Sequence, residues 1–159
     1  MDNFKQVITK GLVPGTLASV ISTAALALRA RRESGSPYAG TNATSHAVWG
    51  DEAFTRNAPS WKYTLVGYGI HHASALFWAT IFEQVAGKVL DRNSPAATTL
   101  AAAGAAAVAC FVDYKLTPKR LQPGFEERVS RKSLALVYAA FGLGLAAGAY
   151  FNHRDRQGS

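Results

Sequence analysis

Four long apolar stretches constrain this chain more than any other feature. They cover about residues 7–29, 62–83, 96–116 and 133–151, and charged segments separate them. A helix rises about 1.5 Å per residue and the hydrocarbon core of a bilayer is about 30 Å thick, so about 20 residues are needed to cross it. The pattern predicts an all-α integral membrane protein, a four-helix bundle forming a single membrane domain over residues 1–159.

Whole-chain averages conceal this pattern. The sequence is 48% apolar and 17% charged, which resembles a soluble protein because polar connections offset the apolar stretches. The single cysteine, Cys110, lies in the third stretch and excludes an intrachain disulfide or a cysteine-rich metal site. We expect it to pack against neighbouring helices.

Two of the four stretches admit other interpretations. The first could be a cleavable signal peptide, because Ala25-Leu26-Ala27 fits the small-residue cleavage pattern. The third is so rich in alanine that it could be a soluble helix instead of a membrane-spanning one. For the chain as a whole, the alternative is a soluble helical protein. The second stretch carries no charge between Tyr63 and Phe82, and its flanks, including Glu83, are typical of a membrane interface.

The distribution of basic residues predicts an orientation. Four crossings place both termini on one side, where the termini and the second connection carry six lysines and arginines. The loops at about 30–61 and 117–132, with their flanks, carry eleven. Because basic loops stay in the cytoplasm, we expect both large loops to be cytoplasmic and both termini periplasmic.

Small residues recur at helical spacing in two of the predicted helices. One stripe comprises Gly11, Gly15, Ser19 and Thr23, and the other comprises Ala140, Gly144 and Gly148. Such stripes allow close helix contact, either within the bundle or between protomers. Pro14 removes a backbone donor from the first helix and predicts a local kink or a helix end there.

Polar side chains inside the second and third helices are the candidate functional residues. The second carries Tyr68, His71, His72 and Ser74 near its middle, and the third carries Asp113 near its end. Polar groups inside a membrane mark packing contacts, a ligand site or a proton relay. Tyr68, His71 and Ser74 share one helix face, which we expect to point inward.

No cofactor and no metal site is predicted. Haem bound through His71 or His72 is the alternative, but adjacent histidines on one helix converge poorly on a common metal. The other two histidines, His46 and His153, fall outside the predicted helices.

The two large loops carry further candidates. Asn42, His46, Trp49 and Asp51 belong to a polar run that could form a short helix, and could fold over the helix ends or remain a surface loop. In the third connection, Pro123 predicts a short interfacial helix whose Phe125 and Val129 dip into the membrane. Its basic residues, Arg128, Arg131 and Lys132, would contact anionic lipid headgroups, so the net charge of +7 requires no nucleic acid.

Four apolar helices joined by basic loops, in an alanine-, glycine- and arginine-rich chain, resemble uncharacterised small four-helix inner-membrane proteins of bacteria. The resemblance implies a multi-pass protein of a bacterial inner (plasma) membrane and no particular activity. Small four-helix multidrug transporters differ, because they carry an embedded glutamate in the first helix, whereas residues 7–29 hold no acidic residue.

These observations favour a non-enzymatic membrane protein, such as an accessory subunit, that binds a partner protein, a lipid or a small ligand through its polar face. Phosphate-loop, nucleophile-elbow and zinc-protease motifs are absent from the sequence. A proton-coupled transporter or channel, oligomeric because four helices enclose little space, is the first alternative. The second alternative is a haem- or metal-bearing redox protein or membrane enzyme. All three functions are compatible with a homo-oligomer or with a membrane-protein partner.

Overall fold

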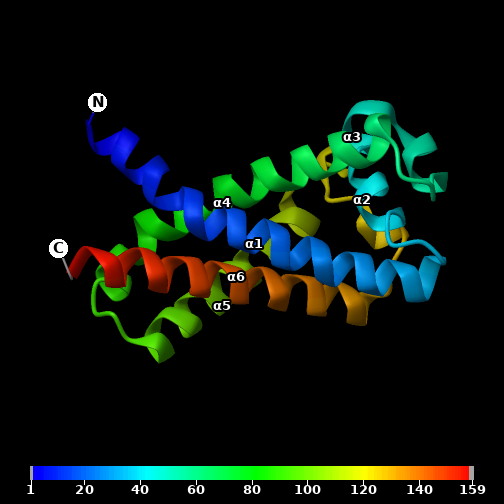
Figure 1. The fold of residues 1–159 in the computed structure, drawn as a ribbon. Helices are drawn as coiled ribbons and strands as arrows, with labels where there is room; N and C mark the ends of the chain where they lie inside the picture. Colours follow the sequence, from blue (N-terminus) through cyan, green and yellow to red (C-terminus); the bar gives the residue numbers. More distant parts are fainter. Residues whose placement is uncertain (1, 158–159) are drawn as a thin grey trace.

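Four long helices form the body of the protein, and short helical turns close one end of it. The computed structural model describes residues 2–157, and every regular element within that range is helical. The long helices are α1 (Asp2–Ser34), α4 (Val66–Leu90), α5 (Pro95–Phe111) and α6 (Arg131–Gln157). Both termini lie at one end of the bundle, and the segments around α2 and α3 lie at the other (Figure 1). The predicted all-α class is therefore confirmed.

Three of these helices are long and apolar enough to cross a membrane. Within residues 2–157, the qualifying segments are Ile8–Ser34, Pro95–Leu116 and Arg131–Arg154. The predicted second crossing does not qualify, although α4 has 25 residues. Its length suffices, but the polar side chains of Tyr68, His71, His72 and Ser74 lower its apolar content. The four-crossing prediction is thus supported at three of its four helices.

Three of the four long helices, α1, α4 and α6, extend beyond the apolar stretches that predict them, whereas α5 with the turn after it ends at Leu116, as predicted. Residues Trp61–Leu65 form a π turn before α4, and residues Val112–Leu116 form another after α5. Ser94 caps α5 by accepting a hydrogen bond from the Ala97 amide, and Pro95 follows at the first helical position, where its missing donor costs nothing. Helix α4 continues to Leu90 and α6 to Gln157. Glu83 and His153 therefore lie inside helices, not at the interfacial ends where the sequence places them.

Both small-residue stripes pack within the chain. Added Cβ atoms at Gly11 and Gly15 would lie 2.7 Å from Thr80 and 2.8 Å from Leu76, so these glycines bring α1 against α4. On α6, Gly144 and Gly148 meet the α1 backbone at Ala18 and Pro14. Helices α1 and α6 run side by side in opposite directions (Figure 1). The sequence leaves open whether these stripes pack within the bundle or between protomers, and the structure places both of them within the bundle.

Pro14 creates a contact between the same two helices. Helix α1 continues through Pro14, which has no amide hydrogen to donate to the carbonyl of Lys10 four residues earlier. The side-chain amide of Asn152 on α6 donates to that carbonyl at 2.8 Å. The alternative that the first helix ends at Pro14 is therefore wrong, and the proline frees the Lys10 carbonyl to accept a hydrogen bond from α6.

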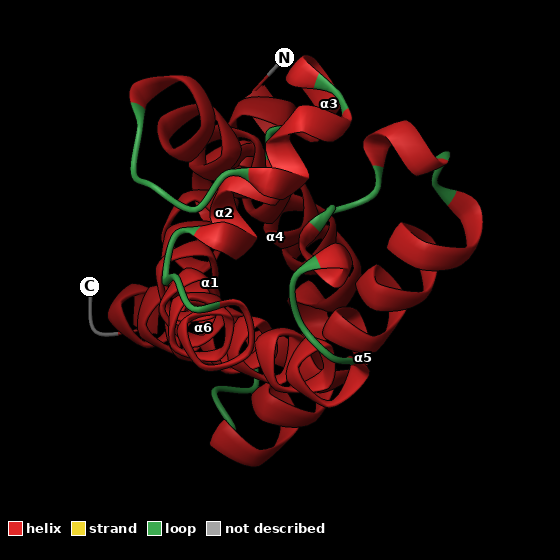
Figure 2. Cartoon of the chain, turned by 90° about the vertical axis from the view of Figure 1, so that its right-hand side faces the viewer, coloured by secondary structure: helices red, strands yellow, loops and turns green. Residues whose placement is uncertain are grey.

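Short turns from both large loops close the other end of the bundle. The first loop forms α2 (Ala39–Thr44), α3 (His46–Trp49) and a 3₁₀ turn at Asp51–Thr55. The second forms 3₁₀ turns at Lys119–Leu121 and Phe125–Glu127. Viewed from this end, the turns lie across the ends of the long helices (Figure 2). Helix α2 reaches the bundle because Gly67 of α4 leaves room for the Thr41 carbonyl.

The predicted interfacial helix starting at Pro123 is wrong. Only the short turn Phe125–Glu127 forms, and Gly124 before it adopts a φ of 84°, which turns the chain inward. Phe125 and Val129 are 2% and 7% exposed and pack with Leu26 and Val137. They belong to the protein core, because the third connection folds inward and places both side chains between α1 and α6.

Candidate ligand-binding site

A cavity of about 120 Å³ lies beneath the loops, between the long helices. Of the polar residues singled out from sequence, His71 and Ser74 of α4 and Asp113 of the turn after α5 line it. Other polar groups reach it from elsewhere in the chain: Ser22 from α1, Thr44 from α2, Gln122 from the third connection and Tyr138 from α6. Much of the remaining wall is apolar, as small-molecule sites usually are.

His71 is joined to α1 through Ser22. The Ser22 hydroxyl oxygen lies 2.7 Å from the Ala18 carbonyl and 2.8 Å from His71 Nε2. A helical serine gives its one proton to the carbonyl four residues earlier, so its oxygen remains to accept from the imidazole. This assigns the proton of a neutral His71 to Nε2 and leaves Nδ1 as an acceptor.

Asp113 is joined to α6 through Tyr138. The Tyr138 hydroxyl donates to Asp113 Oδ2 at 2.6 Å, a short distance typical of a hydrogen bond to a carboxylate. The Tyr138 ring also meets the rings of Tyr114, at a centroid distance of 6.1 Å, and Phe125, at 6.5 Å. The carboxyl group is therefore held in a fixed position beside an aromatic cluster.

Glu126 extends this network into the loop. Tyr114 donates to Glu126 Oε2 at 3.2 Å. Burial raises the pKa of Glu126, and the hydrogen bonds that it accepts offset part of that effect. The polar groups beneath the loops are thus connected from α6 through the end of α5 to the third connection.

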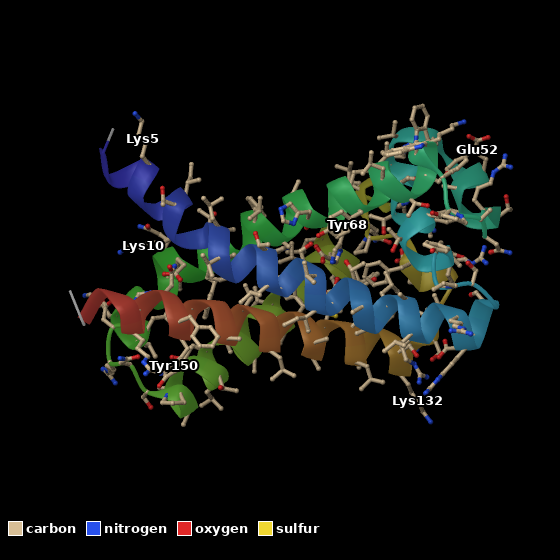
Figure 3. All side chains as sticks on the ribbon, viewed as in Figure 1. Lys5, Lys10, Glu52, Tyr68, Lys132 and Tyr150 are labelled. Atoms are coloured by element: carbon tan, nitrogen blue, oxygen red, sulfur yellow. The ribbon has the colours of Figure 1, made fainter. Side chains whose placement is uncertain are left out.

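Tyr68 and His72 do not line the cavity. Their rings stack at 5.8 Å, and the Tyr68 hydroxyl accepts a hydrogen bond from Ser19 at 3.4 Å. Tyr68 instead lines a separate open groove beside Trp61, on the part of α4 nearer the loops (Figure 3). The Nδ1 atom of His72 is buried and has no hydrogen-bond partner in the described part of the chain. The polar residues of α4 are therefore divided between two surroundings.

Residues of the first loop cover the cavity end of the bundle. Asn42 is fully buried; its amide donates to the carbonyls of Arg56 and Ala58, and its oxygen accepts from Thr64. The Trp49 indole donates to the Lys62 carbonyl at 2.8 Å. Asp51 is exposed at the start of a 3₁₀ turn. Asn42 and Trp49 therefore fasten the loop to itself and to the start of α4.

His46 connects the two large loops. Its imidazole is 4% exposed and lies with Nδ1 3.0 Å from the Ala43 carbonyl and Nε2 3.2 Å from the Lys119 carbonyl. A neutral imidazole can donate to only one of these acceptors, whereas an imidazolium donates to both. His46 therefore joins the first loop to the third connection, the two segments that cover the cavity.

The three basic residues expected at lipid headgroups have different surroundings. Arg128 is partly buried and donates to the Phe54 carbonyl and, at 2.5 Å, to Asn57 Oδ1, so its guanidinium joins the two loops. Arg131 and Lys132 are exposed at the start of α6. Of the three, these two have side chains free to reach a membrane surface.

A second buried polar cluster lies at the other end of the bundle. His153 Nε2 is 2.8 Å from Glu83 Oε2, and His153 Nδ1 is 2.9 Å from Asp91 Oδ1. The Glu83 and His153 side chains are only 1% and 3% exposed. The apolar pattern does not predict this pair, because it ends the second helix at Glu83 and the fourth before His153. Longer helices would have placed both inside the bundle.

Two observations concern what this part of the protein can hold. Within residues 2–157, no three histidine, cysteine or acidic side chains are grouped to hold a metal. The cavity is smaller than a porphyrin, and Nε2 of His71 is engaged by Ser22. The cavity can instead hold a few waters or a small organic molecule, since an engineered cavity of about 150 Å³ accommodates benzene.

Comparison of the chain with protein-family models, curated proteins and solved structures finds no match. Its function therefore has to be inferred from its own geometry.

Proposed function

We propose that the chain is a non-enzymatic, multi-pass membrane protein that binds a small ligand in the cavity beneath its loops. The observation that carries this proposal is the convergence of His71, Asp113 and Tyr138, from three different segments, on one cavity of about 120 Å³. Hydrogen bonds to Ser22 and between Tyr138 and Asp113 fix these side chains before any ligand binds. Such preorganisation reduces the entropic cost of binding.

The outer surface supports placement in a membrane. Large apolar side chains are exposed on all four long helices, among them Leu28 (64%), Val85 (80%), Leu100 (78%) and Leu143 (60%). Exposed apolar surface of this extent is rare on soluble monomers. The charged residues Lys5 and Lys10 lie toward one end of the bundle, and Glu52 and Lys132 lie at the other (Figure 3).

Helix α4 would be the fourth crossing, with two of its polar side chains, Tyr68 and His71, paired with serines of α1. Ser22 lies beside His71, and Ser19 donates to Tyr68. A polar side chain with a partner in a neighbouring helix costs less in a bilayer than one facing lipid. Four crossings place both termini together, as they lie in Figure 1.

The loop end would face the cytoplasm of a bacterial plasma membrane, because it carries the excess of basic residues. Arg131 and Lys132 would then lie against anionic headgroups. A reporter enzyme active only in the periplasm, fused after Ser159, should be active. An inactive fusion at normal expression would contradict this orientation.

Ligand binding can be followed through Trp78, which lines the cavity. Trp49→Phe and Trp61→Phe together leave Trp78 as the sole tryptophan, since the chain has three. A panel of small cations, anions and neutral molecules is titrated against this variant in detergent. We expect at least one class to change Trp78 fluorescence and raise the unfolding temperature. A folded protein that responds to no class would overturn the proposal.

Filling the cavity provides the matched control. Ser74 is exposed at the wall, so Ser74→Phe should block the space without overpacking the core. Ala73→Phe adds the same ring to an exposed neighbour that does not line the cavity. Binding should be lost in the first variant and retained in the second. Equal binding in both would place the ligand elsewhere.

Proton-coupled transport is a second candidate, favoured by buried titratable groups in both halves of α4. His71 and Glu83 are twelve residues apart, or about 18 Å along the helix axis. In proteoliposomes, flux driven by a pH gradient and abolished by His71→Gln would support this candidate. Flux unchanged by that substitution would argue against a relay through the histidine.

A further inference from the structure

The chemistry of the cavity wall identifies a ligand class, on the assumption that the cavity binds a ligand as proposed above. Among the described residues that line it, Asp113 is the only one with a carboxylate, and none is a lysine or an arginine. Four aromatic side chains share the wall: Trp78, Phe125, Tyr138 and Phe141. We propose that the cavity is a site for a small organic cation, an amine or a quaternary ammonium group.

The position of Asp113 supports this assignment. It lies in the helical turn Val112–Leu116, which continues α5 at its C-terminal end. The partial negative charge of a helix C-terminus disfavours a carboxylate and attracts a cation. Tyr138 donates to one carboxyl oxygen, Oδ2, and the Trp78 indole also hydrogen-bonds to the carboxyl group, but neither partner carries a positive charge. A bound cation would therefore offset a charge that the protein itself compensates only in part.

The aromatic wall supports the same class of ligand. The Phe125 ring meets the imidazole of His71 at a centroid distance of 6.4 Å and the ring of Tyr138 at 6.5 Å, so these groups form one cluster. Aromatic faces attract cations, and most strongly where water is excluded. An anion would meet both the carboxylate and the negative ring faces, and a neutral molecule would gain from neither.

The cavity volume limits the size of the cation. At about 120 Å³ it is somewhat smaller than the engineered cavity that holds benzene. A ligand of about five to seven non-hydrogen atoms follows from that comparison. Choline is a suitable probe, and 3,3-dimethylbutan-1-ol is its neutral counterpart, with carbon in place of nitrogen.

Binding should also depend on pH, because a proton competes with the cation for Asp113. The titratable groups near this carboxyl are Tyr138 of α6, His71 of α4, and Cys110 and Tyr114 of its own helix, with Glu126 bonded to Tyr114. Protonation of either Asp113 or His71 adds positive charge to the cavity, so choline affinity should fall as pH falls. In His71→Gln, the pH dependence of choline binding that remains is the one caused by protonation of Asp113.

The test compares both probes on the protein whose sole tryptophan is Trp78. We expect choline to bind at least about tenfold more tightly than the neutral alcohol, because a desolvated cation–aromatic contact and a carboxylate act together. Asp113→Asn should remove this preference, since asparagine still accepts from Tyr138 but carries no charge. Asp51→Asn, the same change at an exposed loop position, should retain it.

The possible outcomes distinguish failure of the cation assignment from failure of the proposed ligand binding. Equal binding of the two probes would overturn the cation assignment and leave the ligand-binding proposal standing. Preferential choline binding that survives Asp113→Asn in folded protein would overturn the role assigned to Asp113 in selecting the cation. If choline does not bind but another class from the panel does, the assignment fails alone. If no class binds, the assignment and the proposed function fail together.

Discussion

The two ends of the helix bundle accommodate buried polar groups in opposite ways. From the middle of the bundle toward the end that holds the termini, glycines bring the backbones of α1 and α6 into contact, and at that end His153 is held between Glu83 and Asp91. At the loop end, α1 and α4 diverge around α2 (Figure 1), and polar groups face a cavity. The cavity therefore lies at the loop end, whereas the buried polar groups of the termini end are paired with one another. Substitutions at the termini end should change stability while leaving ligand affinity intact in the molecules that fold.

The largest effect is expected at the buried pair of the termini end. His153→Ala leaves Glu83 buried without its imidazole partner, which should lower the free energy of unfolding by about 3–5 kcal/mol. Unfolding in detergent, followed by circular dichroism, measures the loss. Replacing both residues by leucine should recover most of it, because no uncompensated charge remains. A loss under about 0.5 kcal/mol in His153→Ala, within the range of an ordinary surface substitution, would show that the pair does not hold this end together.

A smaller effect is expected from separating α1 and α6. The Cβ of Gly144→Ala would meet the backbone of Ala18, so the variant should lose about 1–3 kcal/mol of stability. Gly104 of α5 is the matched control, because an added Cβ there meets nothing within 4 Å. Gly104→Ala should be neutral or slightly stabilising. Equal destabilisation by the two substitutions would argue against tight packing between α1 and α6.

The contact created by Pro14 should contribute less. Asn152→Ala leaves the Lys10 carbonyl without a donor and should cost about 1 kcal/mol. Pro14→Ala restores the helical amide, so Asn152→Ala should cost little in that background. A double-mutant cycle of unfolding free energies measures this coupling. Additive effects would mean that the asparagine acts through some other contact.

The smallest effect is expected at the surface of the loop end. Hydrogen bonds from Lys62 and then from Tyr63 lower the pKa of Glu52. Its contribution to stability is therefore present at neutral pH and is lost as the pH falls through that lowered pKa. Glu52→Gln should be less stable than the wild type at neutral pH and equal to it in acid. The difference should shrink in a Lys62→Met background, and a difference that grows in acid would contradict the assignment.

The fold was predictable to the extent that it depends on local sequence. The length of each apolar stretch predicts a long helix, because it can be read from consecutive residues without knowing which helices are neighbours. The helix ends were not predictable in the same way, since α4 and α6 continue into charged residues that apolar length excludes. Apolar length therefore places Glu83 and His153 at an interface, although each is buried because the other lies opposite it.

The candidate site was predictable only in part for a related reason. His71 and Asp113 stand out as polar residues in apolar stretches. Their partners Ser22 and Tyr138 do not, because a lone hydroxyl in a helix is common and pairing depends on which helices adjoin. Likewise, the amphipathic spacing of Phe125 and Val129 suits either a membrane surface or a core. The choice between a membrane surface and a core depends on how the loops pack against the long helices, which the spacing does not reveal.

The polarity of α4 has a consequence for how the protein is made. For a chain that crosses a bilayer, α4 is the one long helix whose composition does not favour insertion by itself. Its hydroxyl and imidazole groups meet Ser19 and Ser22 of α1, and its backbone is approached closely by Gly11 and Gly15. Helix α1 leaves the ribosome first, so it is available as a partner when α4 emerges. Biogenesis of α4 would thus depend on a preceding segment of the same polypeptide, which acts as an internal insertion chaperone.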